Sequence, residues 1–171
     1  MRIPDPKEGL VINYSYLWHR EAQAGAEEGR KDRPCAVVLA GKNNRVIVAP
    51  ITHSQPVAGT RSIEIPPQIK KSLGLDHGRS WIVTNDVNYF TWPGTDLRPM
   101  KNRESATVAY GTLPPNFTKQ ITADVRDQMQ RRQTKAVNRD EATPPKDWGK
   151  KVERSKPRPA PKPDPDKGRS R

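Results

Sequence analysis

The chain contains a single cysteine and no long apolar stretch, and each shortage excludes a class of protein. Because Cys35 is alone and lies within an apolar segment, an intrachain disulfide is excluded and a cysteine-based metal site is not expected. No segment approaches the ~20 apolar residues that a membrane helix needs, and the first residues lack the apolar core of a signal peptide. We therefore expect a cytoplasmic protein with no membrane partner, no metal and no other cofactor.

Hydrophobic residues are also scarce, at 32% of the chain. The proline content, with 18 residues, and the net charge of +12 are both high. The last 28 residues hold 7 of those prolines and half of the net charge, without apolar periodicity. We interpret residues 138–171 as a basic, proline-rich disordered tail and residues 1–137 as one folded domain. Since the rest of the chain keeps the other half of the charge, a polyanionic partner is favoured. A tail that only solubilises the protein is the alternative.

Two apolar segments, each ending beside a polar side chain, carry the strongest structural signal. Arg33 and Pro34 open the first segment, and Thr52 closes the second. Pro34 suits the first position of a strand, and the polar turn at 41–44 between the segments favours a hairpin. In such a hairpin Arg33 and Thr52 lie toward the same end. A guanidinium beside a hydroxyl is suited to binding a phosphate.

The remaining pattern predicts a mainly β fold of the α+β class. Further strands are expected at 9–18, 62–65, 80–83 with a continuation to residue 90, and 106–110, and loops at 19–32 and 91–99. A short helix is expected at 68–72, and a longer one follows Pro114–Pro115, where apolar residues recur at every fourth position: Phe117, Ile121, Val125 and Met129. Together these elements predict a small SH3-like barrel with a short inner helix and a C-terminal helix.

The motifs also occur in an informative order. An acidic loop at 25–29 is followed by Arg33–Pro34 before an apolar strand, and then by a strand that ends in Ala-Pro-Ile-Thr at 49–52. Segments 63–65 and 74–83 and the helix after Gly111 complete an order that resembles the MazF/PemK family of toxin endoribonucleases, over roughly residues 9–129. The resemblance implies an SH3-like barrel that forms a homodimer, cleaves single-stranded RNA such as mRNA without a metal, and is neutralised by a cognate antitoxin.

The resemblance also implies which residues act. Members of the family use the Arg of the Arg-Pro pair and the Thr that ends the next strand at the scissile phosphate, and these correspond to Arg33 and Thr52. An acidic residue after a later strand is implicated as the base in some members, and Asp86 holds that place here. Several relatives have a His before the loop Glu and an Arg two residues before the late Asp, where this chain has Ala26 and Thr84. Proton transfer is therefore the role that the motifs define least.

His53 directly follows Thr52 and is the type of side chain best matched to proton transfer near neutral pH. Asp86 and Glu27 are the other candidates for the base. For RNA binding we expect contributions from Glu27, Asn88, Trp92 and Arg98, with Trp92 stacking on an unpaired base. Three more basic residues could guide the RNA backbone: Lys70, Lys71 and Arg79.

Two other functions stay open from the sequence. One is a non-enzymatic toxin of the same fold that binds DNA gyrase through its terminal helix. The other is an inactive RNA-binding barrel in which Ala26 and Thr84 mark the loss of catalysis. The site residues also have purely structural alternatives: pairing with an acidic neighbour for Arg33, a strand cap for Thr52 and a turn for Asp86.

Overall fold

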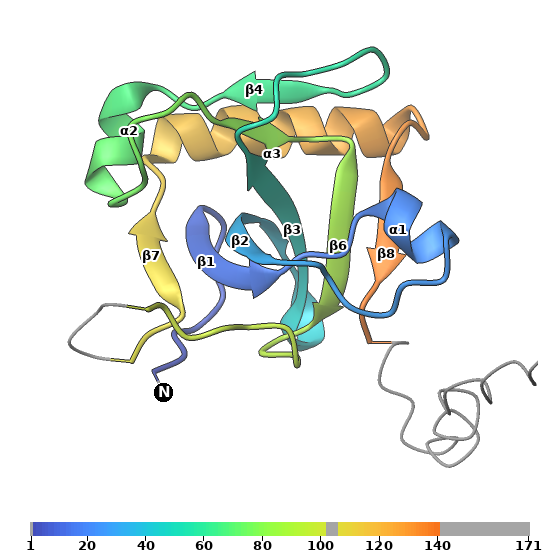
Figure 1. The fold of residues 1–171 in the computed structure, drawn as a ribbon, viewed down its shortest axis with the longest axis horizontal. Coiled ribbons are helices and arrows are strands. Elements are labelled where there is room, and N and C mark those ends of the chain that lie inside the picture. The colour runs from blue at the N-terminus through green and yellow to red at the C-terminus, as the bar shows by residue number, and fades with distance from the viewer. Residues whose placement is uncertain (1, 102–105, 141–171) are drawn as a thin grey trace, which may run out of the picture.

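The computed structural model describes residues 2–101 and 106–140, and these form a small α+β fold built on a mostly antiparallel sheet (Figure 1). The strands are β1 (Leu10–Ser15), β2 (Asp32–Ala40), β3 (Arg45–Thr52), β4 (Ser62–Glu64), β5 (Trp81–Val83), β6 (Asp86–Thr91), β7 (Ala109–Thr112) and β8 (Lys135–Asn138). The helices are α1 (His19–Gln23), α2 (Pro67–Ser72) and α3 (Pro115–Gln130), with a turn of 3-10 helix at Lys42–Asn44. The expected mainly β, α+β class is confirmed.

The sheet branches at β3. Its main path runs β4-β5-β3-β2-β1-β7, and β3 also pairs with β6, whose other side carries β8 in parallel. Because these pairings leave β4, β7 and β8 as edges within the described residues, the strands do not close on themselves. The described strands therefore form an open sheet, and the predicted SH3-like barrel is not confirmed.

The predicted hairpin forms from β2 and β3. The two strands pair antiparallel with Cys35 opposite Pro50, so Arg33 and Thr52 lie at the same end, just beyond that pair. At the other end Asn43 adopts a positive φ of 60°, which asparagine tolerates better than most residues. The hairpin thus brings the two predicted phosphate-binding residues to one edge of the sheet.

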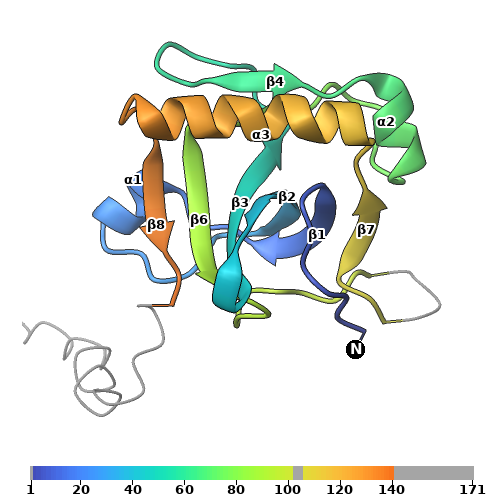
Figure 2. The ribbon, with the colours of Figure 1, turned by 180° about the vertical axis from the view of Figure 1, so that it is seen from behind.

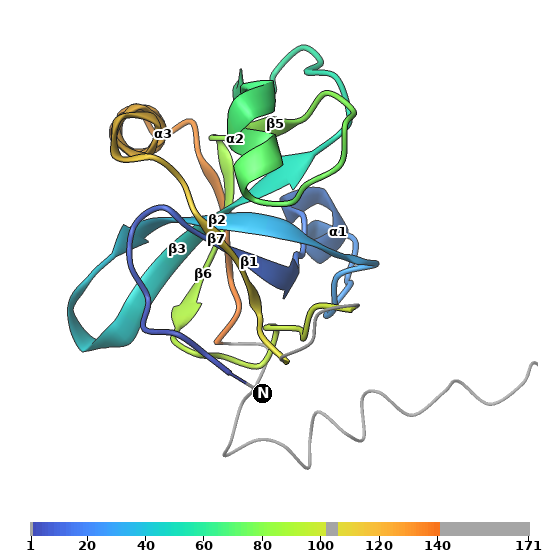
Figure 3. The same ribbon diagram turned by 90° about the vertical axis from the view of Figure 1, so that its left-hand side faces the viewer.

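Alternate residues of the central strands pack into two cores on opposite faces of the sheet, as the period of a strand dictates. One core contains Val11, Ala36 and Val38, whereas their neighbours Ile12, Cys35 and Val37 belong to the other. Helix α3 covers the first core (Figures 2 and 3), and three of its four periodic residues are buried there: Phe117, Ile121 and Val125. Replacing Ile121 by Ala would cost about 2–5 kcal/mol of stability, because a buried side chain would leave a cavity.

Two elements were not predicted. Helix α1 replaces part of the expected loop, and it lies beside the unpredicted strand β8 (Figures 1 and 2). The chain after β8 is held by Arg139, a buried residue whose guanidinium donates to both carboxylate oxygens of Asp96, at 2.9 and 3.1 Å. The domain therefore continues through Asp140, past the boundary predicted after residue 137. The predicted disorder of residues 141–171 lies outside the described residues.

Within the described ranges no helix has the length and apolar character needed to cross a membrane.

Candidate functional site

A cavity of about 380 Å³ opens at the end of the hairpin, where β2 begins and β3 ends. Three of the predicted site residues line it together: Arg33, Thr52 and His53. The segment from β1 to β2 and the loop between α2 and β5 complete the wall, with contributions from Trp18, Arg20, Lys31, Asp76 and Ser80. Tyr110 of β7 also lines the cavity, so five separate stretches of the sequence build one site.

Arg33 contributes a cation to this cavity. Its Nε is buried and has no hydrogen-bond partner among the described residues. The guanidinium lies 5.1 Å from the centroid of the Trp18 ring, which Arg20 also approaches, at 5.4 Å. Burial lowers the pKa of Arg33, yet an arginine side chain stays protonated in proteins. The site therefore holds a partly desolvated positive charge, which attracts an anion more strongly than an exposed one.

Thr52 and His53 stand at the end of β3. The Thr52 hydroxyl oxygen accepts a hydrogen bond from the backbone N–H of Ser54, at 3.1 Å, so its own hydrogen remains able to donate. The His53 side chain is 61% exposed, and its Nε2 lies 2.8 Å from Oδ2 of Asp76. The pKa of Asp76 is lowered, mainly because Lys70 donates a hydrogen bond to it. The charges of His53 and Lys70 act in the same direction. Asp76 is therefore a carboxylate at neutral pH.

No family model matches the chain. A search of the curated proteins found no match either. The resemblance to the MazF/PemK family therefore rests on the sequence motifs alone and stays a prediction. Function has to be argued from the cavity itself.

Asp86, the predicted base, does not line this cavity. It opens β6 and accepts a hydrogen bond from the Tyr16 hydroxyl at 2.5 Å. Burial raises the pKa of Asp86, and hydrogen bonds from Tyr16 and the His19 backbone partly oppose that rise. A raised pKa suits a general base, but a base must also reach the proton that it removes. Asp86 is not among the residues that line the cavity with Arg33 and Thr52, so its role as the base stays a prediction.

Asn88 and Trp92 were predicted to bind RNA, and both belong to the interior. Asn88 is fully buried, where its side chain accepts from the Leu17 N–H at 3.1 Å and donates to the Leu17 carbonyl at 2.7 Å. Trp92 is 8% exposed, stacks on Phe90, and donates from Nε1 to the Pro4 carbonyl. Neither side chain has a face left for a base. Asn88 and Trp92 are each two residues from Phe90, so the period of a strand places all three on one face.

Glu27 and Arg98 lie outside the cavity lining. Glu27 is exposed in the loop after α1, and its backbone carbonyl accepts a hydrogen bond from Arg139 at 2.9 Å. Arg98 donates to the carbonyls of its own loop, at 2.7 and 3.2 Å, and approaches Asp32 on the cavity wall, at 3.8 Å. Arg98 is thus near the rim, where it is already committed to structural contacts.

Sequence reasoning missed Asp76 and Ser80 and expected Lys70 at the surface. Lys70 is instead 4% exposed and bonded to Asp76. The only local signal was the pair of glycines at 74 and 78, which marks a tight loop around Asp76. That signal predicts a loop but not its position beside His53, which depends on the pairing of β3 with β5.

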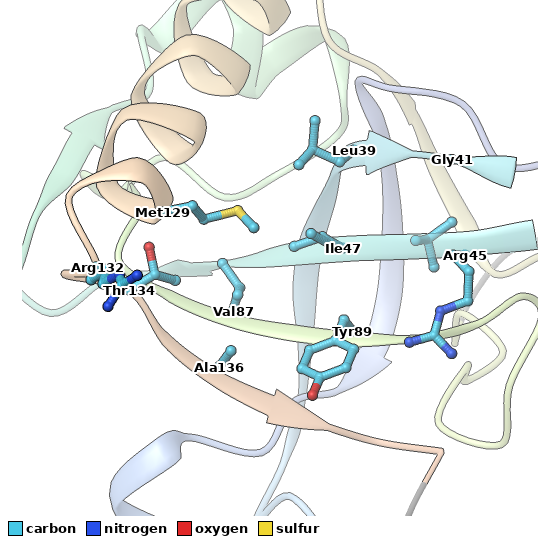
Figure 4. Close-up of a pocket in the computed structure, with 11 residues that line it drawn as sticks. Leu39, Gly41, Arg45, Ile47, Val87, Tyr89, Met129, Arg132, Thr134 and Ala136 are labelled. Atoms are coloured by element: carbon cyan, nitrogen blue, oxygen red, sulfur yellow. The ribbon is translucent and has the colours of Figure 1, made fainter.

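An apolar groove of about 460 Å³ lies on another side of the molecule, between the hairpin, β6 and the end of α3 (Figure 4). Leu39, Ile47, Val87 and Met129 line its middle, with Arg45 and Arg132 near its two ends. The residues that line it include no carboxylate, histidine or cysteine. Among the described residues, no group of three or more His, Cys, Asp or Glu side chains is arranged to hold a metal. The hairpin-end cavity is the better candidate for chemistry.

Proposed function

We propose that the protein is an endoribonuclease that cleaves single-stranded RNA, with the hairpin-end cavity as its active site. The observation that carries the proposal is the convergence of Arg33, whose Nε has no partner in the described structure, with Thr52 and His53. A guanidinium, a hydroxyl and an imidazole can bind the oxygens of a phosphodiester and transfer a proton. The motifs that resemble MazF/PemK toxins support the same function.

The reaction is attack by a ribose 2′-hydroxyl on the adjacent phosphorus, which forms a 2′,3′-cyclic phosphate and releases a 5′-hydroxyl. Arg33 stabilises the charge that develops on the nonbridging oxygens, and Thr52 donates a hydrogen bond to one of them. These contacts need no metal. His53 and Asp76 also line a second, shallower hollow of about 560 Å³, together with Arg79 and Trp81. His53 lines both hollows, which suits the binding of nucleotides that flank a scissile phosphate.

The finer features implied by the resemblance belong to the same proposal. They are an SH3-like barrel, a homodimer, cytoplasmic action on mRNA that inhibits growth, and neutralisation by a small antitoxin. Light scattering of the purified protein would give the dimer mass, and co-expression with a small protein encoded next to it would restore growth.

The direct test is incubation of the purified protein with a long single-stranded RNA in EDTA. We expect cleavage products with 2′,3′-cyclic phosphate and 5′-hydroxyl ends. Arg33→Ala should lower the rate by at least about 100-fold, as for loss of one donor to a developing oxyanion, and Thr52→Ala by about tenfold. Arg45→Ala and Thr112→Ala, which change an arginine and a threonine outside the cavity, serve as matched controls.

Three results would count against the proposal. If the wild type binds RNA but never cuts it, the inactive RNA-binding barrel is the correct function. Cleavage that survives both Arg33→Ala and Thr52→Ala would move the active site elsewhere. Growth inhibition that persists in Arg33→Ala without any RNA cleavage would instead favour the gyrase-binding toxin.

A further inference from the structure

Lys70 of α2 is 4% exposed, although an ammonium group is costly to bury. Its Nζ donates to Oδ1 of Asp76 at 2.9 Å and to the carbonyl of Gly78. These bonds compensate the buried charge and tie the loop between α2 and β5 to the helix. The buried lysine therefore holds the Asp76 carboxylate in one position.

The other oxygen of that carboxylate faces Nε2 of His53, at 2.8 Å. The second ring nitrogen, Nδ1, lies 3.1 Å from the Arg79 backbone carbonyl and 3.2 Å from Oγ of Ser80. A carboxylate and a carbonyl can only accept hydrogen bonds. A ring with protons on both nitrogens donates to Asp76 and to the Arg79 carbonyl at once, while the Ser80 hydroxyl can either accept from Nδ1–H or donate to a bare Nδ1.

The other charged groups near the ring are engaged elsewhere. The Arg79 guanidinium pairs with Glu64 at 2.6 Å and lies over the Trp81 ring. Arg33, which also lines the cavity, lies over Trp18. Asp76 is therefore the charged group that contacts His53 directly, and the exposed side chain leaves Nε2 open to a bound substrate beside it.

We propose that His53 is the general acid of this ribonuclease and that Asp76, held by Lys70, is the residue that positions it. This inference rests on the proposed function. Nδ1–H stays bonded to the Arg79 carbonyl and anchors the ring. Nε2–H, shared with Asp76 before the reaction, is the proton that is transferred.

In the step itself, the 2′-oxygen forms a bond to phosphorus and its proton passes to water. The bond from phosphorus to the 5′-oxygen breaks, and the electron pair stays on that oxygen. The oxygen takes the Nε2 proton of His53 and leaves as a 5′-hydroxyl. His53 is then neutral and regains a proton from water, so the cycle needs no other reactant.

The test uses two versions of one oligonucleotide that spans a cleavage site mapped with the full-length wild-type protein. One has the natural 5′-bridging oxygen at that site, and the other has sulfur there. A thiolate leaves without being protonated, so the sulfur substrate does not need the acid. His53→Ala should lose at least about 100-fold on the natural substrate, and should stay within about tenfold of the wild type on the sulfur substrate. Asp76→Asn should lose about 10- to 100-fold on the natural substrate, with the same recovery.

Two matched variants complete the design. Arg33→Ala should be impaired on both substrates, because phosphate binding is needed in either case. His77→Ala, an exposed histidine next to Asp76, should behave like the wild type on both. If the wild type cleaves and His53→Ala is unaffected, or is impaired equally on both substrates, the general-acid role is wrong while the ribonuclease stands. Failure of the wild type on every RNA would overturn the proposed function itself.

Discussion

Asp76 lines the cavity and Asp86 does not, and their surroundings shift their pKa values in opposite directions. The bond from Lys70 lowers the pKa of Asp76, whereas burial raises that of Asp86. A lowered pKa suits a permanent anion that orients a histidine. A raised pKa would suit a base, but Asp86 is bonded to Tyr16 and is not among the residues that line the cavity. Geometry therefore decides between two residues of the same type.

Asp86→Asn should change how stability depends on pH. The Asp86 carboxyl titrates near its ordinary pKa of about 3.9 in the unfolded chain and at a higher pKa in the fold. Between these two values the folded protein binds more protons, so the contribution of Asp86 to the free energy of unfolding falls as the pH rises. The variant lacks this loss, and its free energy of unfolding relative to the wild type should rise with pH through that window. Urea unfolding at a series of pH values from about 4 upward measures the difference.

The same variant separates structure from catalysis. RNA cleavage by Asp86→Asn should stay within about threefold of the wild-type rate, because the residue does not touch the proposed site. A relative stability that falls with rising pH would contradict the burial of the carboxylate. A loss of cleavage by 100-fold or more, with the fold intact, would restore Asp86 as the base.

The sequence predicted the placement of some candidate site residues but not of others, for a physical reason. Arg33 and Thr52 are strand-end residues, and a two-stranded hairpin suffices to bring them together. Asn88 and Trp92 were chosen for their chemistry, whereas their exposure depends on which face of β6 is covered. That face is covered by β1 and the segments around it, which no local pattern specifies.

At the scale of elements, one carboxylate links α3 to the sheet. Asp124 of α3 accepts hydrogen bonds from Arg61, at 2.8 and 3.2 Å, and from the Thr84 hydroxyl at 2.6 Å. Burial raises the pKa of Asp124, but the bonds from Arg61 and Thr84 outweigh it, so the net pKa is lowered. Thr84, where several relatives of the resembled family carry Arg, is fully buried after β5. In this fold its hydroxyl holds helix α3 in place through the hydrogen bond to Asp124.

Thr84→Val should therefore destabilise the protein without altering its chemistry. Loss of a hydrogen bond to a charged group should lower the free energy of unfolding by about 2 kcal/mol. Thr112→Val, at an exposed position of β7, is the matched control and should change it by less than about 0.5 kcal/mol. Denaturant unfolding gives both values. An intact fold with lost RNA cleavage would show instead that Thr84 acts in the reaction.

Elements whose pattern is local were predictable, and those defined by tertiary contacts were not. Helix α3 follows from the spacing of Phe117, Ile121 and Val125, and it begins at the predicted prolines. Strand β8 has only four residues, and its first two are exposed, so it lacks a clear alternation. It forms because β6 offers an unpaired edge and because the buried bond between Arg139 and Asp96 fixes the chain that follows.

At the scale of the whole molecule, the clearest property of the sequence is its positive net charge of +12. Residues 141–171 carry ten basic and five acidic residues, and the rest of the chain is also basic. Binding that neutralises phosphates releases counterions, so affinity should fall linearly with salt on logarithmic axes. The net charge attracts any polyanion, whereas the cavity that contains Arg33 would bind one particular phosphate.

A salt titration should separate the contribution of the net charge to RNA affinity from that of the Arg33 cavity. We expect the Arg33→Ala variant to bind single-stranded RNA with a slope close to that of wild type, shallower by only about 0.7, the value for one phosphate contact. Removing residues 141–171 from the same variant should reduce the slope further, by about 0.7 for each phosphate contact that the tail makes. Fluorescence anisotropy with a labelled RNA at several salt concentrations measures both slopes. An unchanged slope after removal of the tail would mean that this segment only keeps the protein soluble, and that the basic surface of residues 1–140 alone attracts the RNA.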